Sequence, residues 1–170
     1  MGRKVEVQIE SIRVSLVNQG RVVLLKDVEK GRILPLMICS AETEMLMLAI
    51  QDIALSRPVP HDILKNAITQ LGGRPAYTEI YEYKSEIYYS RLVVTQNNEP
   101  LYIECRPSDA VSLAVRCHIP LLVDEEILEQ TGITAERDIR LSSNDSKDDD
   151  DLSAFSSFFN TMNGDDDGSI

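Results

Sequence analysis

Two stretches of the chain follow the same order of alternating strands, turn and helix, and this repeat constrains the fold more than any other feature. Residues 22–50 lie over residues 87–115 at a constant offset of 65, without a gap. A Pro-Leu pair recurs in both stretches, and Glu44 falls on Asp109. The repeat predicts an α+β fold, in which duplicated β-β-β-α units form a mixed or antiparallel sheet with helices packed on it.

The individual elements follow from the period of the apolar residues and from Pro, Gly and Asn between them. Residues 5–16 alternate with a phase shift near Ser11, which predicts one long strand with a bulge or two short strands. The other predicted strands are 21–27, 33–39, 77–83, 87–95, 100–105 and 119–123. The predicted helices run from a cap at Ser40 to about Ser56, from a cap at Asp62 to Gly72-Gly73, from Pro107 to Cys117, and from Asp124 to Gly132.

The charge is divided unevenly along the chain. Residues 1–140 carry 16 Lys and Arg against 20 Asp and Glu, a net charge of −4, whereas residues 141–170 carry one Lys against eight Asp, a net charge of −7. We therefore expect a folded domain over 1–140 and a disordered acidic tail over 141–170. In an alternative interpretation, Phe155, Phe158 and Phe159 anchor the tail on an unknown protein partner.

Two further features bear on the compartment. The chain has no run of about 18 to 20 apolar residues and no N-terminal signal-peptide pattern, so we expect a cytoplasmic protein without a membrane segment. Cys39, Cys105 and Cys117 form no CxxC pair, and each lies in an apolar setting that predicts a buried, reduced thiol.

The densest polar segment of the folded part is residues 104–110, at a strand end and a helix start. Arg106 and Ser108, with Asp109 beside them, could bind an anion such as phosphate through the guanidinium and the free N–H groups of the helix start. Arg116 lies two turns beyond Asp109 on the same helical face. The competing interpretation is structural, with Ser108 as a cap and Asp109 paired with Arg106.

A second candidate is the pair His61-Asp62 after Pro60. The imidazole of His61 could act as acid, base or metal ligand. Equally, Asp62 could be an N-cap with His61 before it. Glu44, Asp62 and Asp109 are all expected near helix starts and could together hold Mg²⁺ or Mn²⁺. A phosphate-binding glycine loop, HExxH, GxSxG and an EF-hand loop are all absent from the sequence.

Three blocks of the sequence resemble the bifunctional nuclease domain family: LPLMICSAETEMLMLAIQ, RPVPHDILKNAITQLGG and IECRPSDAVSLAVRCHIPLLVDEEILEQTGI. The resemblance covers about residues 5–132 and implies a compact α+β fold, hydrolysis of DNA and RNA, and a homodimer. The polar motif residues of the family fall on Glu44, His61, Asp62, Arg106, Ser108, Asp109 and Arg116. One departure is Met45, where the family usually has a small residue, and this favours Asp109 over Glu44 as the main carboxylate.

Two functions are therefore expected as alternatives. The first is a metal-assisted nuclease in which Asp109, with Glu44 or Asp62, holds the cation and His61 assists proton transfer. Arg106, Ser108 and Arg116 then bind the phosphate. The second is a non-catalytic module that binds an anion or a partner protein, which the mildly acidic fold favours.

Overall fold

The computed structural model describes residues 2–14, 20–53 and 55–133, and the α+β fold class is confirmed. The expected end of the domain at 140 and the whole tail 141–170 lie outside the described residues. The elements are β1 (Lys4–Val14), β2 (Arg21–Asp27), β3 (Ile33–Ile38), α1 (Ser40–Ile50), α2 (Pro60–Gln70), β4 (Arg74–Lys84), β5 (Ile87–Gln96), β6 (Glu99–Cys105), α3 (Pro107–Cys117), β7 (Leu121–Asp124) and α4 (Glu125–Thr131).

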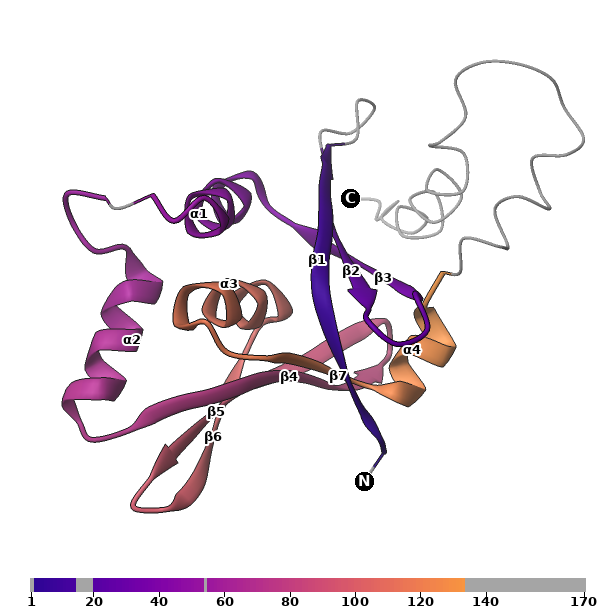
Figure 1. Cartoon of the computed structure of the whole chain (residues 1–170). Helices are drawn as coiled ribbons and strands as arrows, with labels where there is room; N and C mark the ends of the chain where they lie inside the picture. The colour runs from indigo at the N-terminus through magenta and orange to yellow at the C-terminus, as the bar shows by residue number, and fades with distance from the viewer. Residues whose placement is uncertain (1, 15–19, 54, 134–170) are drawn as a thin grey trace, which may run out of the picture. The chain divides into compact units, whose positions relative to one another are not determined.

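One mixed sheet of seven strands, in the order β3-β2-β1-β7-β4-β5-β6, organises the fold (Figure 1). Two antiparallel meanders, β1 to β3 and β4 to β6, form its halves. The short strand β7 joins them, because it pairs antiparallel with β1 and parallel with β4. The halves are thus connected through β7, which follows all the other strands that the structure describes.

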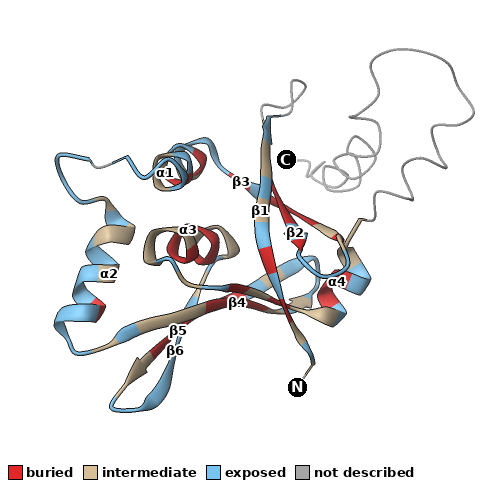
Figure 2. Ribbon diagram, viewed as in Figure 1, coloured by how far each residue is buried: buried red, intermediate tan, exposed pale blue. Residues whose placement is uncertain are grey.

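The helix α3 lies at the centre of the fold, with α1 and α2 on either side of it (Figure 1). It is the most buried helix (Figure 2), because the five residues from Ala110 to Ala114 are all buried. Val111 and Ala114 pack with β1, β2 and β3 in the main core, whereas Leu113 packs with Leu92 and Ile68. The N-terminus of α3 is therefore held rigidly relative to the sheet.

Several predicted boundaries are confirmed and others are wrong. β1 is one strand with a bulge between Ile9 and Ser11, and α4 is capped by Asp124 and ends at Gly132. α2 ends before Gly72, whose φ of +83° suits glycine. The expected extension of α1 to Ser56 is wrong, because the helix ends at Ile50 and the chain turns there.

The helix starts of the two strand-helix units, β3 with α1 and β6 with α3, are not separated by the predicted offset of 65 residues. β3 and β6 are each followed directly by a helix N-cap, Cys39 in one unit and Arg106 in the other. These N-caps are 67 residues apart (39 to 106), so the third helical residues are Glu42 and Asp109. The pairing of Glu44 with Asp109 is therefore wrong at the helix starts. The duplication itself stays a prediction.

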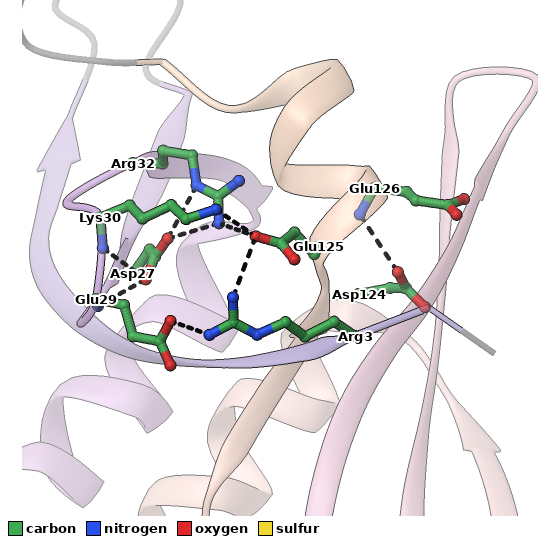
Figure 3. A network of polar contacts seen from close by, with 8 residues as sticks. All are labelled: Arg3, Asp27, Glu29, Lys30, Arg32, Asp124, Glu125 and Glu126. Atoms are coloured by element: carbon green, nitrogen blue, oxygen red, sulfur yellow. Dashed lines mark hydrogen bonds and ion pairs between the residues drawn. The ribbon is translucent and has the colours of Figure 1, made fainter.

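A network of charged side chains joins the β2–β3 turn to α4 (Figure 3). The fully buried Asp27 accepts hydrogen bonds from the backbone N–H of Glu29 at 2.7 Å and from Arg32 Nε at 2.9 Å. Glu125, the first residue of α4, accepts from Lys30 Nζ at 2.6 Å and contacts Arg32 Nη2 at 3.4 Å. Burial acts to raise the pKa of Asp27, but the hydrogen bonds from Glu29 and Arg32 hold this pKa below its usual value.

The thiols are less buried than predicted. Cys39 is exposed, whereas Cys105 and Cys117 are partly buried, and all three are free. Burial raises the pKa of Cys105 and of Cys117, which favours the neutral thiol. Across the described residues, no helix is both long enough and apolar enough to cross a membrane.

Candidate active site

The first turn of α2 brings His61 toward α3. Pro60 is the first residue of the helix and Val59 the N-cap, because proline fixes φ and lacks the N–H that this position leaves unpaired. Asp62, predicted as the N-cap, is the third residue, and its Oδ2 accepts the Val59 N–H at 3.1 Å. His61 Nε2 lies 3.2 Å from Asp109 Oδ1.

The first turn of α3 supplies the carboxylate and the guanidinium. Arg106 is the N-cap residue and donates to Asp109 from Nε at 2.9 Å and from Nη2 at 3.1 Å. A bidentate pair of this kind fixes the guanidinium and carboxylate planes relative to each other. Ser108, which the structural interpretation took as a cap, is the second helical residue and half-buried.

A residue that the sequence did not single out completes this group. Glu42 Oε1 lies 2.7 Å from Arg106 Nη1, and Glu42 Oε2 accepts the Cys39 N–H at 3.2 Å. The spacing of three residues from Cys39 is that of a capping box, which was the signal available in the sequence. We call His61, Arg106, Asp109 and Glu42 the Asp109 cluster.

The electrostatics of the Asp109 cluster favour an ionised carboxylate. Burial acts to raise the pKa of Asp109, but the hydrogen bonds from Arg106 and His61 outweigh burial, and the pKa lies below its usual value. The hydrogen bond to Asp109 in turn raises the pKa of Arg106. The side chain of Arg106 is nevertheless 68% exposed, so this cation is open to a ligand from solvent.

A pocket of about 850 Å³ adjoins the Asp109 cluster. His61, Arg106 and Asp109 line it together with apolar side chains of α2 and β6, including Leu64 and Ile103. Pockets with apolar walls and a few converging polar groups are typical of ligand-binding sites. A ligand with a flat apolar part and an anionic group would match this lining.

One ring nitrogen of His61 has no partner. Nδ1 is buried and has no hydrogen-bond partner among the described residues, while Nε2 faces the ionised Asp109. Because an ionised carboxylate only accepts, Nε2 carries the proton of a neutral imidazole, and Nδ1 of that neutral ring is an acceptor. A buried acceptor without a partner costs about 1 to 3 kcal/mol, so a group that donates to Nδ1 would be stabilised there.

Arg116 and Asp62 lie at a different pocket. Arg116 Nη1 is 2.9 Å from Asp62 Oδ1, and its Nη2 donates to the Met45 carbonyl at 3.3 Å. Both residues line a pocket of about 590 Å³ that also contains Arg57 and Lys65. The structure therefore divides the predicted site residues into two groups, with His61 and Asp109 in one and Asp62 and Arg116 in the other.

The carboxylates predicted for a cation do not converge. Glu44 is exposed and makes no hydrogen bond or ion pair with a described residue. Asp62 pairs with Arg116, and Asp109 pairs with Arg106. Among the residues that the structure describes, no group of three or more His, Cys, Asp or Glu side chains could hold a metal ion. This donor set does not fit Mg²⁺ or Mn²⁺.

In this domain, the N-terminus of the central helix α3 carries the Asp109 cluster and borders a pocket. Comparison with known sequences identifies the class of the domain. Residues 23–136 match the bifunctional nuclease domain family. The chain therefore belongs to the bifunctional nuclease domain family.

Three relatives illustrate its range. An uncharacterized protein of Mycobacterium tuberculosis is 27% identical over 95% of this chain and 96% of its own length. Bifunctional nuclease 2 of Oryza sativa subsp. japonica is 27% identical over 73% of this chain, and Bifunctional nuclease 1 of Arabidopsis thaliana is 25% identical over 66% of it. The matched part makes up 39% and 35% of these two plant proteins.

Proposed function

We propose that this protein hydrolyses phosphodiester bonds of DNA or RNA at the Asp109 cluster. The observation that carries the proposal is an exposed guanidinium, Arg106, held beside a His61–Asp109 pair at the mouth of the 850 Å³ pocket. Membership of the bifunctional nuclease domain family and the names of the plant relatives support the same chemistry.

Arg106 is the group that binds the phosphate in this proposal. A guanidinium has five N–H donors, and the contacts to Asp109 and Glu42 use three of them. Two N–H groups therefore remain for a phosphate oxygen. Asp109 and Glu42 hold the guanidinium in place, so little side-chain entropy is lost when the phosphate binds.

His61 is the general base, and Asp109 orients it. The Nε2–H group donates to Asp109, which leaves the Nδ1 lone pair to take a proton from the attacking water. The water oxygen bonds to phosphorus and the bond to the leaving oxygen breaks. Solvent water protonates the leaving oxygen, and His61 Nδ1 then releases the proton that it took to solvent. Because Nδ1 is buried in the free protein, the ring or the first turn of α2 has to move when the substrate binds.

The expectation of Mg²⁺ or Mn²⁺ stays a prediction, and no step above uses a cation. The chemistry that such an ion would supply is charge stabilisation on the phosphate. In the arrangement described, Arg106 is the cation beside the carboxylates. Measuring cleavage with and without added metal therefore distinguishes a metal-assisted nuclease from one in which Arg106 alone stabilises the charge on the phosphate.

The test compares purified wild type with Asp109→Asn and Glu44→Gln on plasmid DNA and on single-stranded RNA, each with Mg²⁺, with Mn²⁺ and with EDTA. Both substitutions replace a carboxylate by its amide, but only Asp109 lies in the Asp109 cluster. We expect Asp109→Asn to lose cleavage by about two orders of magnitude or more, because the general base His61 loses the carboxylate that orients it, and Glu44→Gln to retain it. Equal cleavage by all three proteins would show a contaminating nuclease and end the proposal.

A non-catalytic anion-binding or protein-binding module is the second candidate. The carboxylates of Glu42 and Asp62 close capping boxes, and each pairs with an arginine, which is also what a structural role would require. For this candidate we expect inorganic phosphate to bind with wild-type protein and not with Arg106→Met, without cleavage of any nucleic acid. Cleavage that depends on Asp109 excludes it.

The expected homodimer and the cytoplasmic location also stay predictions. For the dimer we propose the edge strand β6, because Leu101, Tyr102 and Ile103 are all exposed on it. A free strand edge with apolar side chains is a typical site of strand pairing between two copies.

A further inference from the structure

The second half of β1 has a strand edge without a partner. β1 pairs with β7 only from Lys4 to Val7, and from Gln8 onward it pairs only with β2 among the described residues. In Figure 1, β1 continues past the end of β7, and the helices α1 and α3 lie on that side of it. Backbone N–H and C=O groups of this edge are therefore available to another chain.

This edge forms one wall of an apolar groove of about 620 Å³. Residues from Gln8 to Ile12 line one side, and Met47 and Ile50 of α1 with Val115 of α3 line the other. Met47 is 41% exposed and Ile50 is 45% exposed, so both have apolar surface left to bury. The groove shares no lining residue with the pocket beside the Asp109 cluster.

A polar atom in the groove also lacks a partner. Ser11 Oγ is buried and has no hydrogen-bond partner in residues 2–14, 20–53 and 55–133, and Ser11 lies directly after the bulge of β1. A buried hydroxyl without a partner costs about 1 to 3 kcal/mol. A ligand with backbone donors or acceptors would recover part of this free energy, whereas a purely apolar ligand would not.

We propose that this groove binds an extended, cationic peptide segment, which adds as a strand to the free edge of β1. Strand addition satisfies the edge through backbone hydrogen bonds and places alternate side chains in the groove, here against Met47, Ile50 and Val115. The charged lining residues are Glu6 and Glu10, and none is basic. Lys26 pairs with Glu10 at 2.9 Å, so Glu6 is the carboxylate that favours positive charge on the peptide. Five residues of β1 correspond to a peptide length of roughly 16 Å. The proposed peptide binding goes beyond nuclease activity and does not depend on it.

The test uses the full-length protein and a fluorescent peptide of alternating valine and arginine. The matched control is the same peptide with alternate backbone amides methylated, which keeps its charge and side chains but removes hydrogen-bond donors. We expect saturable binding of the first peptide, slower amide exchange of residues 8–12 when it is bound, and binding of the methylated peptide weaker by about tenfold, the effect of about 1.4 kcal/mol. Equal binding of the two peptides would mean that the positive charge of the peptide is attracted to the acidic protein without backbone hydrogen bonds. That result would overturn strand addition.

Two protein variants locate the binding surface. Ile50→Arg introduces a positive charge into the groove, and Ile53→Arg introduces the same charge on a side chain of similar exposure outside it. We expect about tenfold weaker binding for Ile50→Arg and wild-type binding for Ile53→Arg, with both proteins folded by circular dichroism. Equal effects of the two variants would overturn the groove as the site. The informative amides are those of residues 8–12 that point away from β2. Slow exchange of these amides in the free full-length protein would show the edge covered by this chain or a second copy, which would also overturn the proposal.

Discussion

Asp109 holds together two residues that are far apart in the sequence. It is the third residue of α3, and its two oxygens contact His61 of α2 and the N-cap Arg106. A carboxylate at this position complements the helix dipole, but the dipole alone needs neither His61 nor Arg106. In the proposed nuclease, the side chain therefore combines this structural role with the orientation of the base His61.

The pH dependence of stability measures the structural part of this role. The pKa of Asp109 is lowered in the folded state, so the ionised form stabilises the fold above the unfolded pKa of about 3.9, and this contribution is lost as the pH falls through the folded pKa. We expect Asp109→Asn to reduce the free energy of unfolding by about 1 to 2 kcal/mol at pH 7, and by much less near pH 3. Urea denaturation at both pH values measures the difference, and a constant gap would contradict the predicted ionisation.

Removing the buried hydroxyl of Ser11 should raise the free energy of unfolding instead of lowering it. Ser11→Ala removes a buried Oγ that has no hydrogen-bond partner. We expect the free protein to gain up to about 1 kcal/mol in the free energy of unfolding, measured by urea denaturation. Ser90→Ala is the comparison, because Ser90 Oγ donates to the Cys105 carbonyl at 2.7 Å. Stabilisation by both substitutions would contradict the unpaired state of Ser11.

At the residue scale, the sequence predicted which side chains are polar at helix starts but not which of them meet. The prolines at 60 and 107 fix the helix starts, so Val59 and Arg106 are the N-caps although serine and aspartate are the usual capping residues. The gapless offset hid Glu42, because it aligned strands rather than helix starts. The contact of His61 with Asp109 joins residues 48 positions apart, which no local pattern encodes.

At the element scale, the link between the β2–β3 turn and α4 depends on the buried pair Asp27–Arg32 (Figure 3). Arg32→Met leaves the buried carboxylate of Asp27 without its cation, and we expect a loss of about 3 kcal/mol in the free energy of unfolding. Arg3→Met is the control. Arg3 is half-exposed, pairs with Glu29 at the surface and lies 3.8 Å from Glu125, and exposed pairs contribute at most about 1 kcal/mol each. Chemical denaturation distinguishes the two, and equal losses would contradict the importance of burial.

The edge strand β6 makes a second prediction at this scale. Leu101→Lys places a charge on the exposed edge, whereas Leu71→Lys places one on the more exposed Leu71 after α2. If β6 forms the dimer, Leu101→Lys is monomeric and Leu71→Lys remains dimeric, because a buried unpaired charge disfavours strand pairing. Sedimentation velocity over a range of concentrations measures this. A wild type that is monomeric at every concentration would contradict the proposed dimer.

The order of the strands was beyond the sequence, although the strands themselves were not. Alternation and turn residues predicted the two meanders, which are local structures. The position of β7 between β1 and β4 joins Val5 to Val123 and Ile80 to Val123, pairs that only tertiary packing selects. The free edge of β1 follows from this insertion, because β7 is too short to cover it.

At the scale of the whole molecule, the charge of the chain opposes its proposed substrate. The net charge is −11, and residues 141–170 contribute −7 of it. A negative segment raises the electrostatic cost of bringing a polyanion to Arg106, and salt screens this cost over about 10 Å at 0.1 M. We therefore expect the negative charge of residues 141–170 to increase the salt dependence of the proposed nucleic-acid binding.

Replacing the four aspartates 148–151 by asparagine isolates this effect, because it removes charge and leaves the chain length unchanged. We expect the variant to bind single-stranded RNA several-fold more tightly than wild type at low salt, and the ratio of the two affinities to approach one near about 0.5 M salt, where the Debye length is only a few ångströms. Fluorescence anisotropy with labelled RNA measures both affinities. The control replaces four serines by asparagine and should bind like wild type: Ser142, Ser143, Ser153 and Ser156. A ratio that does not change with salt would mean that the aspartates act through a specific contact rather than through their field.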